Sequence, residues 1–359
     1  MTADTRTIVL DTARRIFAGS FPAAALRQAT EGFWLAEQWR VLEEAGLPLA
    51  LVDESAGGFG LDVAEALQIV RLAAAFAVPL PLAETMLANF LLTRAGLTPA
   101  EGPATIAFHP AASFRLGGSG RLEGSAPAVV WAGHVQSVVL LASAGDAGGD
   151  VLVRVRKGGW NIVETGRTLN GLPADAISVR TGIAEADRAP LPQGLDAQAV
   201  FRAGAAIRSI GLAGAMRRAV EMTASFVQER SQFGRPLSKF QVIQHDMARM
   251  LEQSAAAEAS ADMAADAFAS GMPELPIAVA KARTSEAAGI VAGLAHQLHG
   301  AIGVTAEFPL HHVTRQLWAW RDEFGNEAFW NRRLGRVALN RPADDLWAFV
   351  TALETGEGR

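Results

Sequence analysis

The chain of 359 residues contains no cysteine and no tyrosine. The lack of cysteine excludes disulfide bonds, thiolate metal sites and cysteine nucleophiles, and the lack of tyrosine removes one common acid–base group. Basic blocks are also missing, and the net charge is −5, which argues against nucleic acid as a partner. Any chemistry must therefore come from carboxylates, from the seven histidines or from a cofactor.

Long hydrophobic runs are scarce as well. No uninterrupted apolar segment is long enough to span a bilayer, and residues 1–17 mix charged and apolar positions without the apolar block of a signal peptide. We therefore expect a soluble, cytoplasmic protein without membrane insertion. The length exceeds that of one typical domain and allows a large core.

Three regions of different sequence pattern follow one another along the chain. Residues 1–102 are predicted to be helical, as shown by the stripe of Leu35, Trp39 and Leu42, and residues 193–359 are predicted to form a helical bundle. Between them, residues 103–192 contain short β-prone runs at 104–108, 128–132, 137–142, 151–155, 161–164 and 177–180. This order predicts an α+β chain with an N-terminal helical domain, a small antiparallel β domain and a C-terminal bundle.

A hinge between two long helices lies at residues 230–250. Gly234 and Pro236 break the first helix, and Ser238 with Gln241 predicts a capping box for the second. The turn brings a cation and an amide, Arg230 and Gln232, beside the ring of Phe233. A second informative stretch begins at Gln297, where a helix is expected to end and Gly300 and Gly303 follow.

Together these two stretches resemble the acyl-CoA dehydrogenase family of flavoproteins. Its signature is an arginine, Phe-Gly, a short spacer and Phe-Gln, which correspond here to Arg230, Phe233-Gly234 and Phe240-Gln241. The resemblance implies FAD as cofactor, an acyl-CoA thioester as substrate, α,β-dehydrogenation as the reaction and an electron-transfer flavoprotein as electron acceptor.

In this family the two motifs contact the FAD of a neighbouring subunit, which implies an oligomer. The residues implied as cofactor-binding are Arg230, Gln232, Phe233, Gln297, Gly300 and Ala301. An arginine suits this role because its planar fork binds phosphate oxygens with charge-assisted hydrogen bonds. Ala301 replaces the second glycine of the family loop, so a change in the backbone fit is expected there.

The sequence departs from the family at the catalytic base, which is usually a glutamate before a glycine. That position is Phe324, before Gly325, and the family's other base position falls near Gly204 and Ala205. The family's Thr-Glu-Pro run, which shapes the flavin face, has no counterpart in residues 105–120.

Three explanations stay open at this stage. The chain resembles most closely the base-lacking subunits of heteromeric acyl-CoA dehydrogenases of steroid side-chain degradation, which work with a homologous catalytic subunit. Alternatively, it is a self-sufficient homo-oligomer that uses Glu323 or Asp322, although a shift of one residue turns a side chain by about 100° on a helix and predicts that both are solvated. The third possibility is a non-enzymatic relic of the fold.

The remaining charged candidates are expected to be structural. His296 and His299 lie three residues apart and His311 adjoins His312, but no HExxH frame surrounds them, so surface or loop positions are expected and no metal site is predicted. Glu307 is expected to be an ion-pair partner rather than a base.

Overall fold

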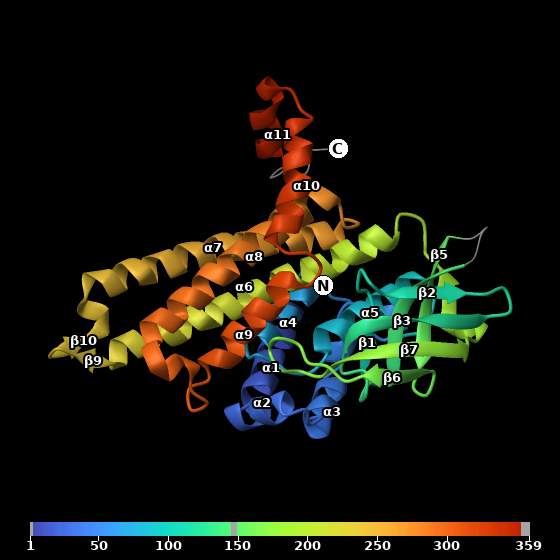
Figure 1. Ribbon diagram of the computed structural model, residues 1–359, viewed down its shortest axis with the longest axis horizontal. Helices are drawn as coiled ribbons and strands as arrows, with labels where there is room; N and C mark the ends of the chain where they lie inside the picture. Colours follow the sequence, from blue (N-terminus) through green and yellow to red (C-terminus); the bar gives the residue numbers. More distant parts are fainter. Residues whose placement is uncertain (1–2, 145–148, 353–359) are drawn as a thin grey trace.

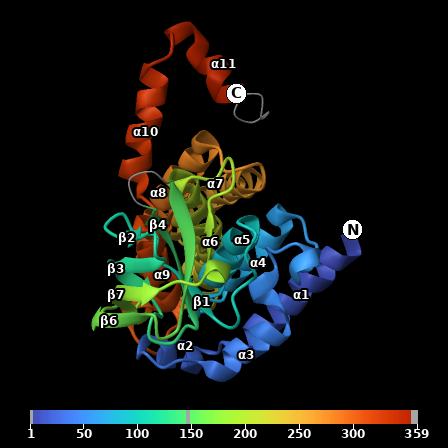
Figure 2. The ribbon, with the colours of Figure 1, turned by 90° about the vertical axis from the view of Figure 1, so that its right-hand side faces the viewer.

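The computed structural model describes residues 3–144 and 149–352. Helices of the N-terminal part cluster around a core that includes Trp39 and Leu42, and Figure 2 shows them beside the β-sheet. They are α1 (Ala3–Ser20), α2 (Ala23–Thr30), α3 (Ala36–Glu44), α4 (Val63–Ala75) and α5 (Leu82–Arg94). The predicted stripe is confirmed, since Leu35, Trp39 and Leu42 are all buried.

A single sheet follows the N-terminal helices in the described part of the chain. Its strands are β1 (Ala104–Ile106), β2 (Ser113–Leu116), β3 (Arg121–Val130), β4 (Ser137–Ser143), β5 (Asp150–Arg156), β6 (Trp160–Glu164), β7 (Ala174–Gly182) and β8 (Arg188–Pro190). The order is β6-β7-β3-β2-β4-β5-β8, with β1 on β4. The predicted α+β order is confirmed, and most strands of the predicted antiparallel domain pair antiparallel, but the sheet is mixed because β1 and β2 each pair in parallel with β4.

The C-terminal part is a bundle of long helices that extends from beside the sheet to the opposite end of the molecule (Figure 1). Its members are α6 (Ala197–Glu229), α7 (Gln241–Ala269), α8 (Glu274–His299) and α9 (Leu310–Asp322). A stripe of residues from Ile277 to Leu298 in α8 is buried, because its members recur at helical spacing. Small residues allow close approach: a Cβ on Gly214 of α6 would lie 2.0 Å from the carbonyl oxygen of Arg71 in α4.

Helix α8 extends into the segment Glu274–Val304, which is long and apolar enough to cross a membrane by composition alone. Helix α8 packs against α6, α7 and α9 inside the bundle, and half of its most apolar stretch is buried. The segment is therefore accounted for as the core helix of the bundle.

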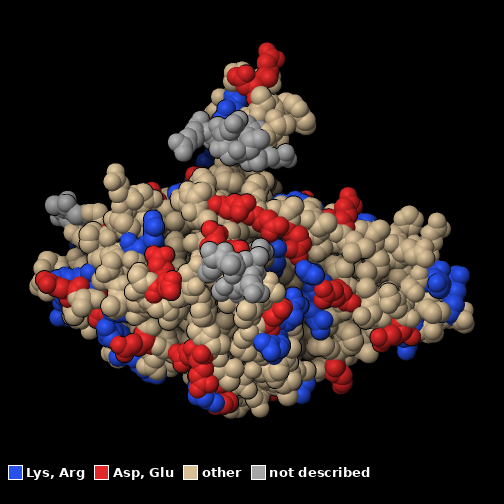
Figure 3. All heavy atoms as spheres, turned by 180° about the vertical axis from the view of Figure 1, so that it is seen from behind, with Lys and Arg blue, Asp and Glu red and all other residues tan. Residues whose placement is uncertain are grey.

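Two short helices, α10 (Glu327–Leu339) and α11 (Leu346–Ala352), project away from the body (Figures 1 and 2). Helix α7 begins at Gln241 with Phe240 as its N-cap and no side-chain cap, because Ser238 lies in a preceding 3-10 turn. The predicted capping box was therefore wrong. On the face seen in Figure 3, acidic and basic side chains are interspersed and no extended basic patch is visible.

Candidate functional site

The hinge after α6 forms a tight β-hairpin at one end of the bundle. Ser231–Gln232 (β9) pairs with Arg235–Pro236 (β10), and the two residues between them, Phe233 and Gly234, have φ values of 53° and 77°. Positive φ at both central positions matches the twist of a two-residue hairpin. The turn holds Phe233 outward, with 90% of the residue exposed.

The second predicted motif lies where α8 ends at His299. Gly300 caps the helix with φ 63° and ψ −146°, a conformation that a side chain disfavours, and a 3-10 turn continues to Val304. Ala301 has no positive φ, so the expected change in backbone fit at this replaced glycine involves no left-handed strain. Gln297, Gly300 and Ala301 are all exposed.

Both motifs lie at the same end of the bundle. Phe226, in the last turn of α6, stacks on His299 at the end of α8, with ring centroids 4.4 Å apart. This contact places the Arg230 hairpin and the Gln297 turn on neighbouring helix ends (Figure 1).

The polar groups of both motifs are free. Among the described residues, the side chains of Arg230, Gln232 and Gln297 make no hydrogen bond or ion pair. An unpaired guanidinium, two free side-chain amides and an uncovered glycine backbone at one end of the bundle offer the donors and the close approach that a pyrophosphate needs. The residues predicted to contact FAD therefore fit that cofactor.

Large apolar side chains surround this end of the bundle. Val242 and Leu251 of α7 are 64% and 55% exposed, and Val304 in the turn after α8 is 70% exposed. With Phe233, they are exposed apolar side chains on the segments that carry the two motifs or follow them directly. Exposed apolar surface of this kind marks an interaction site.

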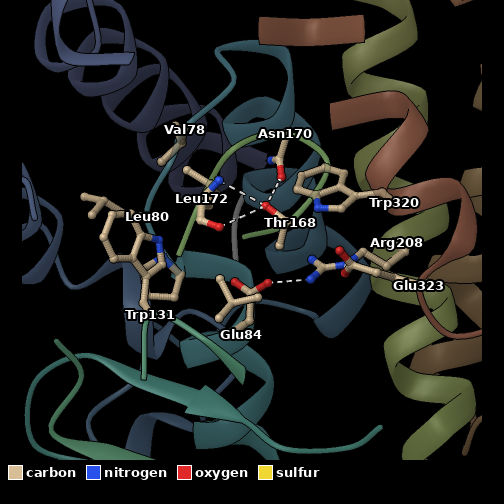
Figure 4. A pocket seen from close by; sticks show the side chains of 12 residues that line it. Val78, Leu80, Glu84, Trp131, Thr168, Asn170, Leu172, Arg208, Trp320 and Glu323 are labelled. Carbon is tan, nitrogen blue, oxygen red and sulfur yellow. Dashed lines mark hydrogen bonds and ion pairs between the residues drawn. The ribbon is translucent and has the colours of Figure 1, made fainter. Parts of the chain in front are cut away.

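A separate cavity lies between the N-terminal helices, the sheet and the bundle (Figure 4). It measures only about 20 Å³, room for one or two water molecules. Its walls come from the start of α5, the end of β3, the β6–β7 loop, α6 and the end of α9, and the lining residues are Val78, Leu80, Pro81, Glu84, Val130, Trp131, Thr168, Asn170, Leu172, Arg208, Trp320 and Glu323. A flavin ring does not fit into this cavity.

Three charged side chains meet at one wall of the cavity. Arg208 of α6 donates from Nε to Glu323 at 2.6 Å and from Nη2 to Glu84 at 2.5 Å. The Arg208 side chain is 5% exposed, and those of Glu84 and Glu323 are 10% and 28% exposed. The guanidinium also lies 4.9 Å from the ring centroid of Trp320.

The expectation that Glu323 is solvated was therefore wrong. Burial raises the pKa of its carboxyl group and the nearby Glu84 raises it further, while Arg208 acts in the opposite direction. A carboxylate held in this pair is not free to approach a carbon acid. Asp322, the other candidate, ends α9 and is exposed.

The two positions at which the family carries its base are in contact with each other. Phe324 has a φ of 54° and lays its ring on Gly204 of α6, where a Cβ would lie 2.3 Å from the ring. Its ring is 5.7 Å from that of Phe201. Aromatic packing thus lies at both positions where the resemblance predicts the base.

A buried lysine holds the turn that carries Glu323 and Phe324. Lys281 of α8 is fully buried, and its Nζ donates to the carbonyl oxygens of Arg321 and Gly325 at 2.8 Å and to that of Trp320 at 3.2 Å. Burial lowers the pKa of Lys281 to about 7. Sequence reasoning missed this residue, although a lysine within the apolar stripe of α8 was a visible signal.

Two of these histidines are buried, whereas surface or loop positions were expected. His299 and His312 are 5% and 9% exposed, because His299 packs between Phe226 and Phe308 and His312 lies on the inner face of α9. Burial lowers the pKa of His312 to about 4. Glu307 is exposed and makes no ion pair within the described residues, so its predicted role as an ion-pair partner was also wrong.

The family assignment rests on both sequence and fold. The family model "Acyl-CoA dehydrogenase, C-terminal domain" matches residues 195–336, which contain α6 to α9, both cofactor motifs and the base position. This similarity to acyl-CoA dehydrogenases supports a flavin-dependent oxidoreductase that acts on an acyl-CoA thioester.

The chain is similar to individual acyl-CoA dehydrogenases in sequence and to solved structures in fold. Acyl-CoA dehydrogenase IpdE2 of Mycobacterium tuberculosis is 28% identical over 274 residues, which cover 76% of this chain and 77% of that protein. The ChsE4-ChsE5 complex from the same organism matches with a TM-score of 0.84 and 21% identity, covering 96% of this chain and 99% of that one. A steroid acyl-CoA dehydrogenase, Tcur3481-Tcur3483, has a TM-score of 0.81 and 24% identity, with coverage of 93% and 97%.

Proposed function

We propose that this chain is the base-lacking subunit of a heteromeric, FAD-dependent acyl-CoA dehydrogenase. It contributes the cofactor contacts at the end of its bundle, while a homologous subunit supplies the catalytic carboxylate. The observation that carries this proposal is the contact of the Phe324 ring with Gly204. The two residues in contact stand at the positions where the resemblance places the base, and neither carries a carboxylate.

The end of the bundle supplies the positive side of the proposal. Arg230 would bind the pyrophosphate of FAD through its guanidinium fork, and Gln232 and Gln297 would add amide donors. Phe233 would pack on the adenosine half, and the backbone at Gly300 and Ala301 would approach the cofactor. When bound, FAD would supply the acceptor for a hydride from the β-carbon of the acyl group, and the α-proton would pass to a carboxylate.

These contacts face outward, which supports a site shared with a second chain. That chain would bury the exposed apolar side chains of Phe233, Val242, Leu251 and Val304, which accounts for their exposure here. Two of the structures with this fold are named as pairs of differently named proteins, ChsE4-ChsE5 and Tcur3481-Tcur3483. A heteromeric partner is therefore the assembly that we favour.

The substrate that we propose is a bulky acyl-CoA thioester, such as a steroid-derived one, because one structure with this fold is named as a steroid acyl-CoA dehydrogenase. An electron-transfer flavoprotein would take up the electrons, and the complex would work in the cytoplasm. The alternative, a homo-oligomer that uses Glu323 as base, is favoured only by the place of this side chain at the cavity and its raised pKa.

Co-expression with a homologous chain that carries glutamate at the base position tests the proposal. The purified pair should hold FAD and oxidise an acyl-CoA in the presence of an artificial electron acceptor, whereas the lone chain should do neither. Turnover by the lone chain that disappears in Glu323→Gln would establish the homo-oligomeric alternative. A chain that forms no complex and binds no flavin would instead be a relic of the fold.

A further inference from the structure

The β6–β7 loop, residues 165–173, forms one wall of the small cavity. Thr168, Asn170 and Leu172 line it, opposite Glu84 and Arg208 (Figure 4). The loop is compact in itself: the Thr168 hydroxyl donates to Asn170 and accepts from the backbone N–H of Leu172 at 3.0 Å. Any molecule that entered the cavity from this side would have to displace the loop.

One arginine ties this loop to the N-terminal helices. Arg167 donates from Nη1 to the carbonyl oxygen of Thr30 at 2.5 Å and from Nη2 to that of Glu31 at 2.9 Å. These carbonyls lie at the C-terminal end of α2, where a cation is favoured by the helix dipole. The same guanidinium also donates to Gly171 of its own loop at 2.7 Å, so it fastens both halves of the loop to α2.

A second arginine ties the loop to the bundle. Arg315 of α9 donates from Nε to the carbonyl oxygen of Leu169 at 3.1 Å. The loop is thus fixed at both flanks, to helices that belong to different parts of the molecule.

Two glycines make room for these guanidinium groups. A Cβ on Gly32, with φ 101°, would lie 3.0 Å from Arg167, and one on Gly171, with φ 89°, would lie 3.2 Å from Arg315. Both residues also have a φ that disfavours side chains. The local sequence therefore accommodates both arginine contacts, one on each side of the loop.

We propose that residues 165–173 are a strap, fastened by Arg167 and Arg315, that keeps this chain's own cavity closed to flavin and acyl groups. The strap itself is a property of the lone chain. Its meaning for the assembly rests on the proposed function: a closed cavity here leaves the partner's site as the place where flavin and acyl group meet.

The lack of cysteine gives a direct test, because a single introduced thiol reports without background. Val78→Cys places the thiol in the cavity wall, at a residue that is 8% exposed. Ser119→Cys, in an exposed turn of the sheet, is the matched control. The rate of thiol labelling by a soluble disulfide reagent is measured for each, with the arginines intact and replaced.

We expect the thiol of Val78→Cys to react far more slowly than that of the control. Arg167→Ala combined with Arg315→Ala should raise its rate by roughly tenfold or more, since the four hydrogen bonds that hold the loop are lost, and should leave the control unchanged. Arg167→Lys should restore part of the protection, because one ammonium still reaches a carbonyl. The free energy of unfolding of each variant is measured in parallel. Labelling through global unfolding would follow this free energy, whereas labelling through an opened loop would exceed the rate that it allows.

Equal labelling of the buried and exposed thiols, or an unchanged rate in the double variant, would overturn the strap. The experiment needs neither partner nor flavin, so its outcome is separate from that of the heteromer. A protected thiol in a chain that forms no active pair would retain the strap and refute the proposed function. An unprotected thiol in a chain that does form an active pair would do the reverse.

Discussion

Replacing Arg208 with methionine should leave two carboxylates facing each other without a cation. Arg208→Met keeps most of the side-chain volume but removes both ion pairs, to Glu84 and Glu323. Because the Arg208 side chain is 5% exposed and that of Glu84 is 10% exposed, and the adjoining cavity holds only one or two water molecules, water cannot fully replace the lost partner. Removing one partner of a buried ion pair costs about 3–5 kcal/mol, and we expect a loss of stability of that size at neutral pH.

The loss should become smaller in acid. Burial and Glu84 raise the folded-state pKa of Glu323 above its ordinary value of 4.5, so the folded state binds this proton more tightly than the unfolded state does. The contribution of Glu323 to stability is therefore fully present below pH 4.5 and falls as the pH rises through its folded pKa. Without Arg208 this pKa rises further, so the deficit of Arg208→Met should widen from pH 5 to pH 7.

Chemical denaturation at several pH values measures this directly. Adding Glu84→Gln and Glu323→Gln to Arg208→Met should recover at least half of the lost stability, because the remaining groups carry no charge. Arg180→Met, at an exposed arginine of β7, is the control and should leave stability unchanged. A loss below about 1 kcal/mol for Arg208→Met would show that the three charges are not the tie between α5, α6 and the end of α9.

Three further changes address other parts of the account. Burial lowers the pKa of His312 from 6.5 to about 4, so the free energy of unfolding should fall by about 3 kcal/mol as the pH falls from 6.5 to 4. In His312→Gln, unfolding measured across this pH range should lack that fall. Gly204→Ala should destabilise the chain by about 1–3 kcal/mol because its Cβ meets the Phe324 ring, and Phe324→Leu in the same chain should relieve the clash in a thermal melt. Arg230→Ala should lower FAD retention by the co-purified pair without changing the melting temperature of the lone chain, whereas Arg249→Ala on exposed α7 surface should change neither.

The helical part of the fold was predictable because its patterns are local. The buried stripe of α8 and the breaks at Gly234 and Gly300 follow from spacing and backbone freedom alone. The sheet was less accessible: β2 and β8 are too short to stand out, and the parallel pairing of β1 with β4 depends on chain reversals that no local pattern encodes.

The candidate site divides in the same way. The Arg230 motif and the Gln297 motif are each a continuous stretch of sequence and could therefore be recognised. The structure brings the two stretches to one end of the bundle. The group of Glu84, Arg208 and Glu323 could not be found, because its members lie 124 and 115 residues apart. The buried His299 and His312 were misjudged because their burial depends on how the ends of α8 and α9 pack against other elements.

The flavin content of the lone chain and of the co-expressed pair tests the central claim most directly. Visible absorption of the purified proteins should show no flavin in the lone chain, even after addition of FAD, and bound flavin in the complex with a glutamate-bearing homologue. Flavin bound by the lone chain together with acyl-CoA oxidation would contradict the account, because this chain would then contain a complete site.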